Sequence, residues 1–168
     1  NYKNDKNLII EKYNELGYRD AAIVNDSVVR YNDKTVDVYL TIDEGKKYYI
    51  RNIDWVGNTI YPSDYLSAVL GMKPGDVYNQ KMLNERTMED EDAVANLYMD
   101  RGYLFFQLVP IEGNVLNDSI DLEIRLFEGP QARINKVVIN GNDRLYEHVI
   151  RRELRTKPGE LFSKSDLM

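Results

Sequence analysis

Residues 56–76 read VGNTIYPSDYLSAVLGMKPGD, and residues 140–160 read NGNDRLYEHVIRRELRTKPGE. The two stretches share a Gly-Asn pair near the start, a Lys-Pro-Gly turn near the end and hydrophobic residues at helical spacing between them. Gly57 and Gly141 lie 84 residues apart, and the stretches align at this offset without a gap. An internal repeat of this kind defines the unit from which a fold is built. The chain is therefore predicted to consist of tandem modules.

The other half of the unit also occurs twice. Residues 13–18 correspond to residues 98–103, and residues 36–45 correspond to residues 120–129. These matches predict three segments along the chain. They are the C-terminal half of a module with a helix and two strands (residues 1–45), a complete module (residues 46–129), and the N-terminal half of a following module with a strand and a helix (residues 130–168).

The complete unit shows the hydrophobic periods of strands and helices in the order β-α-α-β-β. The predicted elements are a strand over 48–57, a helix from about 62 to 70, a helix over 80–100, a strand over 104–111 and a strand over 120–127. Strands that alternate between apolar and polar residues indicate a sheet covered on one face only. The fold class is therefore α+β, with a three-stranded sheet and two helices packed on one face.

Two further expectations follow from the same periods. The second helix is expected to turn one apolar face inward, formed by Leu83, Met88, Val94, Leu97 and Tyr98. In the third segment, Val137 and Ile139 alternate before a Gly-Asn turn, as Ile53 and Trp55 do in the complete unit, which predicts a strand there.

Composition narrows the classes of function. The 168 residues carry a net charge of −6 and contain no cysteine. The negative charge argues against a nucleic-acid binder that relies on phosphate contacts, and the absence of cysteine excludes disulfides, thiol catalysis and cysteine-bound zinc. No apolar run approaches the roughly 18 residues of a membrane-spanning helix.

The ordered set of motifs resembles a known family. Gly-Asn follows the first strand, a Pro-Gly turn joins the helices, and LYMDRGY precedes the second strand. In this combination the chain resembles POTRA domains, the polypeptide-transport-associated modules of BamA-type outer-membrane assembly proteins. The stretches DRGYLFFQ, EGPQARINKVVINGN and VIRRELRTKPGE are most similar to the membrane-proximal modules of that family.

The resemblance implies a non-catalytic arm in the periplasm of a Gram-negative bacterium, attached to a C-terminal β-barrel in the full-length protein. It implies two kinds of partner, unfolded outer-membrane proteins and accessory lipoproteins. Two alternatives stay open. One is the POTRA region of a related exporter, of the two-partner-secretion or TamA-like kind, and the other is an unrelated α+β repeat enzyme or adhesin.

The second strand of the complete module is the candidate binding element. Pro110 lacks an N–H group and is typical of an edge strand, and an edge strand can pair with an extended peptide. The alternative is that Pro110 ends the strand and keeps this edge from pairing. The candidate residues are Leu104, Phe105, Phe106, Gln107, Leu108 and Val109. The equivalent strand of the first segment is predicted over residues 20–24.

Exposed apolar and basic residues supply a second candidate surface. Phe105, Val109 and Phe127 are expected on the uncovered face of the sheet, where they contact either a partner or the adjacent repeat. Arg151, Arg152 and Arg155 form a basic patch, which is either ordinary surface charge or a contact for an acidic lipoprotein surface or anionic headgroups.

Other signals are assigned no chemistry. The carboxylates of the acidic run 88–92 are expected to point in different directions around a helix instead of converging on one metal ion. His148 has no second histidine or cysteine with which to bind a metal. We predict no catalytic, metal or cofactor site. The two partial modules are short for independent folding, so end-to-end self-association of the chain is a further expectation.

Overall fold

A computed structural model describes residues 1–167, and Met168, the last residue of the predicted third segment, lies outside the described residues. The chain divides into two compact units. The first contains residues 1–54, 71–85 and 110–123, and the second contains residues 55–70, 86–109 and 124–168. This division crosses the predicted module of residues 46–129, whose boundaries stay a prediction.

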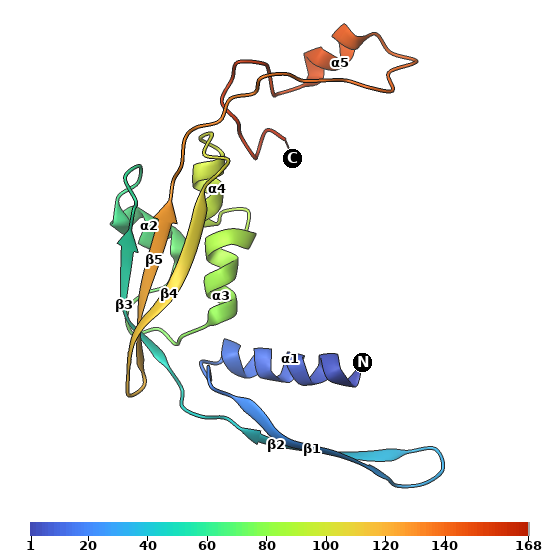
Figure 1. The fold of residues 1–168 in the computed structure, drawn as a ribbon, viewed down its shortest axis with the longest axis vertical. Coiled ribbons are helices and arrows are strands. Elements are labelled where there is room, and N and C mark those ends of the chain that lie inside the picture. The colour runs from blue at the N-terminus through green and yellow to red at the C-terminus, as the bar shows by residue number, and fades with distance from the viewer. Residues whose placement is uncertain (168) are drawn as a thin grey trace. The chain divides into compact units, whose positions relative to one another are not determined.

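The elements follow the predicted α+β order (Figure 1). They are α1 (Tyr2–Glu15), β1 (Ala22–Arg30), β2 (Val36–Asp43), β3 (Tyr49–Val56), α2 (Ser63–Leu70), α3 (Gln80–Asn84), the π-helix η1 (Glu85–Glu89), α4 (Val94–Met99), β4 (Gln107–Leu116), β5 (Ser119–Phe127) and α5 (Glu147–Glu153). One sheet has the strand order β1-β2, and the other has the order β3-β5-β4. The mixed α+β class with a three-stranded sheet is confirmed.

In the first unit, α1 precedes an antiparallel hairpin. The side chain of Asn1 accepts a hydrogen bond from the amide of Lys3 at the start of the helix, as N-cap residues do. Strands β1 and β2 pair from Ala22 opposite Asp43 to Arg30 opposite Val36, with a bulge after Ile23. The first strand is thus longer than the predicted 20–24, because it pairs with β2 along nearly its whole length.

The first unit also holds a buried tyrosine that links three separate stretches of the chain. Tyr78 is almost fully buried, and its hydroxyl donates to Glu112 at 2.7 Å. Arg19 forms an ion pair with the same carboxylate. Burial and the acidic neighbour raise the pKa of Tyr78 far above its ordinary value, so the phenol keeps its proton and donates. The same unit also buries Ile50, Leu83, Ile120 and Leu122.

In the second unit, α2 begins at Ser63, directly after Pro62, close to the predicted start at about residue 62. Leu66 and Leu70 are its buried residues, and the indole N–H of Trp55 donates to Ser67 at 2.8 Å. Aromatic rings fill the core beside it. Tyr98 stacks on Phe106 with ring centroids 4.2 Å apart, a contact that adds to the stability gained from burial.

The predicted second helix over 80–100 is wrong as a single helix. The chain forms α3, the π-helix η1 and, after a turn, α4. Arg86 lies in the irregular part and donates to the carbonyl oxygens of Val69 and Leu70 at the end of α2. These bonds satisfy carbonyls that a helix end leaves free. The expected apolar face shifts as a result, so Met88 is exposed and Thr87 is buried.

Two predicted strands also need correction. Residues 104–106 form a turn rather than the start of a strand, because Leu104 donates to Gly102 and Phe106 donates to Tyr103 through local backbone bonds. In the third segment residues 134–139 form no strand, although an isolated antiparallel bridge joins Arg133 to Leu161. A strand needs neighbours for its hydrogen bonds, and no strand pairs with residues 134–139 within the described residues.

Candidate partner-binding surface

The outer side of β4 is the candidate site for an extended partner. In the sheet order β3-β5-β4, strand β4 has β5 on one side and no strand on the other within the described residues. Backbone groups along such an edge are open to pairing with another chain. In the second unit this edge consists of Gln107, Leu108 and Val109, and Pro110 follows in the same strand.

Apolar side chains gather on the helix-free face beside this edge. Val109 follows buried Leu108, and Phe127 follows buried Leu126, so alternation directs both exposed side chains away from the helices. Val109 is 45% exposed and Phe127 is 58% exposed. Val56 follows Trp55, whose indole contacts α2, and is also exposed. Together with Phe105 these residues form what we call the outer-face patch: Val56, Phe105, Val109 and Phe127.

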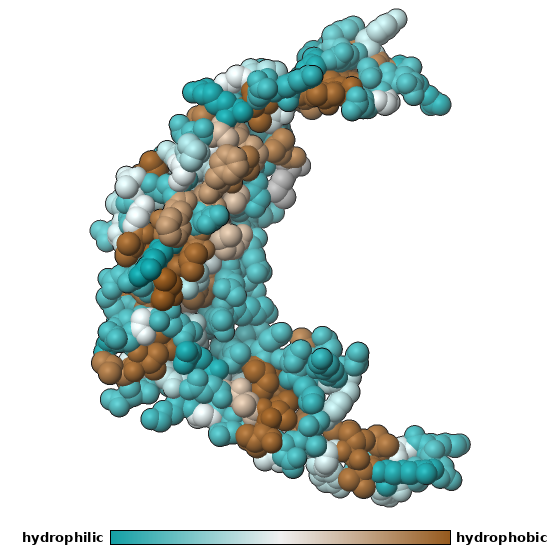
Figure 2. All heavy atoms as spheres, in the orientation of Figure 1, coloured by the Kyte–Doolittle hydropathy of each residue, from teal (hydrophilic) through white to brown (hydrophobic). Residues whose placement is uncertain are grey.

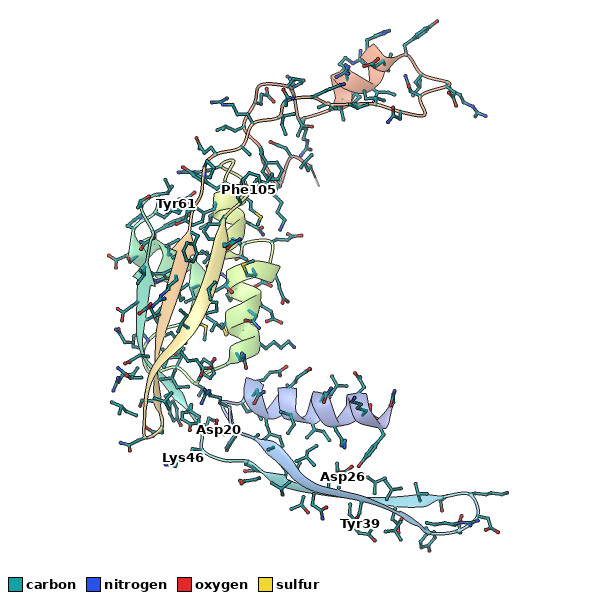
Figure 3. The ribbon with its side chains drawn as sticks, viewed as in Figure 1. Asp20, Asp26, Tyr39, Lys46, Tyr61 and Phe105 are labelled. Atoms are coloured by element: carbon teal, nitrogen blue, oxygen red, sulfur yellow. The ribbon has the colours of Figure 1, made fainter. Side chains whose placement is uncertain are left out.

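Phe105 has the largest exposed fraction of the outer-face patch, 64%, and is labelled in Figure 3. Its neighbour Phe106 is 4% exposed and stacks on Tyr98. A Cβ atom built on Gly129 would lie 3.7 Å from the Cβ of Phe105, so the turn before β4 lies against the residues that follow β5. The turn at 104–106 therefore places Phe106 in the core and leaves Phe105 on the surface.

The module fold does not demand aromatics at these positions. Phe105 corresponds in the repeat to Asp20, and Phe127 corresponds to Asp43. Asp20 accepts a hydrogen bond from the hydroxyl of Tyr48 at 2.7 Å, but Ala132 stands in the place of Tyr48 in the second copy. The exchange from carboxylates to phenyl rings changes a polar connection into an apolar surface, which is typical of a contact site.

Glu128 holds the loop after β3 next to this surface. Its carboxylate accepts hydrogen bonds from the amides of Thr59 at 2.8 Å and Ile60 at 3.0 Å, and from the hydroxyl of Thr59. Partial burial by itself would raise the pKa of Glu128, but these hydrogen bonds outweigh burial and hold the pKa below its ordinary value. The carboxylate therefore stays ionised and positions the loop at neutral pH.

The predicted basic patch is only partly free. Arg151 forms an ion pair with Glu147 and also donates to the carbonyl of Val137 at 3.1 Å. Arg152 pairs with Glu153 at 3.1 Å. Arg155 is exposed and has no ion pair among the described residues. Glutamates therefore compensate the charge of both arginines in α5, Arg151 and Arg152.

Two carboxylates of the acidic run 88–92 form ion pairs with Arg86 where the predicted second helix is broken. Arg86 contacts Asp90 at 3.3 Å and Asp92 at 2.6 Å. Within residues 1–167 no group of three or more His, Asp or Glu side chains is arranged to hold a metal ion. None of the helices in that part of the chain has the length and apolar character needed to cross a membrane.

The structure brings Phe105, Gln107, Val109 and Phe127 to one face or edge, and buries Phe106 and Leu108. Sequence reasoning missed Val56 as a member of the outer-face patch. The signal was present, because Val56 follows the inward-facing Trp55 in an alternating strand.

Comparison with known proteins places these observations in a family context. The family model of POTRA, described as the surface antigen variable number repeat, matches residues 48–129 and 132–167. The outer membrane protein assembly factor BamA of Neorickettsia risticii is 28% identical over 96% of this chain. BamA of Neisseria meningitidis is 25% identical over 99% of this chain. The chain spans about a fifth of these relatives, 21% of each.

Solved structures show the same fold. The crystal structure of Haemophilus influenzae BamA POTRA3-5 matches 99% of this chain and 65% of that chain with a TM-score of 0.73 and 20% sequence identity. BamA from Haemophilus ducreyi lacking POTRA domains 1-3 matches 77% of this chain and 22% of that chain, with a TM-score of 0.53 and 16% identity.

Proposed function

Because the chain belongs to the POTRA family, we propose that it is the POTRA region of a BamA-type outer-membrane protein assembly factor and works as a periplasmic arm. Similarity to two BamA proteins over nearly the whole chain supports this assignment over a related exporter. The proposed role is binding and scaffolding, with no catalytic step. The arm receives unfolded outer-membrane proteins before their insertion, and it acts together with a C-terminal barrel.

The single observation that carries the substrate-binding role is the free side of β4 at residues 107–109. An incoming extended chain can pair with the backbone there, and pairing through the backbone makes little demand on sequence. Such tolerance suits a receiver of many different unfolded chains. The outer-face patch lies on the same side of the strand as Gln107 and Val109 and offers apolar contact to alternate side chains of the guest.

Docking of accessory lipoproteins is the second proposed role. Phe127 and the guanidinium of Arg155 are exposed and supply an apolar and a basic contact. Arg151 and Arg152 are already paired with glutamates, so a partner must compete with these contacts. Rim charges of this kind mainly affect the rate of association and its dependence on salt.

Site-specific photo-crosslinking tests the substrate-binding role. A photoreactive residue is placed at Gln107 or Val109, and at Glu91 as an exposed control on the broken helix. Purified chain is mixed with a urea-unfolded outer-membrane β-barrel protein that is diluted into buffer. We expect crosslinks from positions 107 and 109 and few from 91. Equal labelling at 91, or none at 107 and 109, contradicts the proposal.

A further inference from the structure

Aromatic side chains join α2 and the loop before it to the core of the second unit. Tyr61, labelled in Figure 3, stacks on Tyr65 with ring centroids 5.4 Å apart and an interplanar angle of 21°. Buried Tyr98 meets the ring of Tyr61 edge to face, with centroids 5.1 Å apart. The hydroxyl of Tyr61 also donates to the carbonyl oxygen of Leu97 at 3.2 Å. These contacts fix the ring of Tyr61 from the core side.

The guanidinium group of Arg101 lies over this ring. Its Cζ atom is 4.8 Å from the ring centroid of Tyr61, within the range of a cation–π contact. Arg51 and Arg86 of the same predicted module pair with carboxylates, whereas exposed Arg101 forms no ion pair within the described residues. The three side chains Tyr61, Tyr65 and Arg101 are called the tyrosine–arginine stack. It presents a cation that an aromatic ring positions and that no carboxylate of the described chain neutralises.

The repeat shows that this stack is a local addition to the module. The counterparts of Tyr61, Tyr65 and Arg101 are Leu145, Val149 and Leu16. All three counterparts are aliphatic, so these positions accept uncharged, non-aromatic residues in the neighbouring copies. Leu16 is 51% exposed although the complete unit 46–129 follows it. The connection to a following module therefore leaves this position open.

The exposed groups of the stack suit a carboxylate with an apolar group beside it. A guanidinium can donate two parallel hydrogen bonds to one carboxylate, and Tyr65 is 45% exposed and offers the apolar area of its ring. Tyrosine and arginine are enriched among the residues that contribute most to binding in protein interfaces. Because Tyr61 already positions the guanidinium, binding costs less side-chain entropy than it would for a free arginine.

Charge near the stack favours a single carboxylate over an anionic membrane. Asp64 precedes Tyr65 in the chain, Asp100 precedes Arg101, and both aspartates are exposed. Surfaces rich in anionic headgroups are bound by clusters of several basic residues. The two aspartates would repel such a surface, whereas one carboxylate on a protein can approach the guanidinium between them.

From these observations we propose that the tyrosine–arginine stack is a docking site for a partner protein that presents an acidic side chain beside an apolar one. The carboxylate of the partner pairs with Arg101, and its apolar neighbour packs on the ring of Tyr65. The site shares no residue with the outer-face patch. Figure 2 shows apolar side chains gathered over β4 and β5, where an unfolded chain is proposed to bind, so loss of one binding surface would leave the other intact.

Titration followed by nuclear magnetic resonance tests this site with two end-blocked peptides. In one peptide glutamates alternate with leucines, and in the other glutamines replace the glutamates. The shift of the Tyr65 amide signal gives the dissociation constant for each variant, and the side-chain Nε–H signal of Arg101 locates the contact in the native chain. The variants are Arg101→Gln, Arg101→Lys and Tyr61→Leu. Arg30→Gln is the matched control, because Arg30 is exposed on β1 outside the complete module. A thermal melt checks that every variant folds.

The glutamate peptide is expected to bind the native chain and Arg30→Gln equally, and the glutamine peptide is expected to shift neither signal. Arg101→Gln is expected to weaken binding about three- to tenfold. Arg101→Lys is expected to fall between the two, since lysine keeps the charge and loses the fork. Tyr61→Leu keeps the cation but removes the ring beneath it, so binding is expected to weaken about two- to fivefold.

Three results of the titration overturn the proposal. They are the absence of any shift up to about 10 mM glutamate peptide, equal affinity for the two peptides, and unchanged binding by Arg101→Gln. A second measurement adds vesicles of phosphatidylcholine and phosphatidylglycerol to the same proteins. Vesicles that bind the native chain but not Arg101→Gln also overturn it, because the stack then recognises anionic headgroups and not a protein carboxylate.

Discussion

The amide of Ala132 donates to the carbonyl oxygen of Gly102 at 2.7 Å, and the amide of Tyr48 donates to Gly17 at 2.9 Å in the same way. The repeat makes these two bonds equivalent. In both places a glycine with positive φ follows the end of a helix, and an amide near the start of the next predicted module donates to the carbonyl oxygen of that glycine. Both hydrogen bonds between predicted modules therefore join backbone groups. They place no demand on the side chains at these positions.

This bond predicts a local effect of proline at position 132. Ala132→Pro removes the amide donor, whereas Ala132→Ser keeps it. We expect faster hydrogen exchange in the peptides that cover 98–103 and 159–165 for the proline variant, with the exchange of β5 unchanged. Mass spectrometry of deuterated peptides measures this. Equal protection in both variants means that the bond does not hold the two segments together.

Gly57 is predicted to tolerate no side chain. Its φ is 89°, and a Cβ atom there would lie 2.4 Å from the carbonyl oxygen of Leu126. We expect Gly57→Ala to lower the free energy of unfolding by at least about 2 kcal/mol, since both backbone strain and a clash oppose it. Gly75→Ala is the control, because Gly75 has φ 96° but open space around its Cβ. A similar loss in both variants, measured by urea unfolding, would show that the contact with Leu126 is unimportant.

The adjacent phenylalanines are predicted to respond oppositely to truncation. Phe106 is buried and stacks on Tyr98, so Phe106→Ala is expected to cost about 3–5 kcal/mol of unfolding free energy. Phe105 is mostly exposed, and Phe105→Ala is expected to change stability by less than about 0.5 kcal/mol. The same Phe105 variant is expected to reduce crosslinking of unfolded outer-membrane protein at position 109. Unchanged crosslinking would remove Phe105 from the proposed surface.

Arg86 is predicted to hold the broken helix together. It donates to carbonyls at the end of α2 and pairs with Asp90 and Asp92. Because these partners lose the guanidinium group that binds them, Arg86→Met is expected to lower the unfolding free energy by about 1.5–3 kcal/mol. Arg30→Met removes an exposed pair with Asp33 and is expected to cost little. Equal effects of the two substitutions on urea midpoints would argue against a structural role for Arg86.

Glu128 predicts a pH dependence of stability. Its pKa is lowered in the folded chain by hydrogen bonds from Thr59 and Ile60, against the opposing effect of burial. A group with a lowered folded pKa stabilises the fold above its unfolded pKa, roughly 4.3 for glutamate, and that contribution is lost as the pH falls through the folded value. The stability difference between the native chain and Glu128→Gln should therefore shrink below about pH 4.3. A difference that stays constant between pH 7 and pH 3 contradicts this assignment.

Periodicity and the internal repeat predicted the element types because they depend on local patterns. Alternation in 120–127 and the Pro62-Ser63 start gave β5 and α2 nearly at their observed bounds. The same patterns predicted the α+β class and a likeness to the POTRA family. They also indicated that Phe127 and Val109 lie on the uncovered face, since alternation alone assigns a residue to one side of a strand.

Tertiary contacts decided the rest. The second helix breaks where Arg86 finds the carbonyls of α2, a contact between residues 16 and 17 positions apart that no helical period reveals. The strand expected at 134–139 is absent because a strand exists only with a neighbour to pair with. The sequence alone thus determined which residues can form each element, and the partners available in space decided which elements form and which faces stay open.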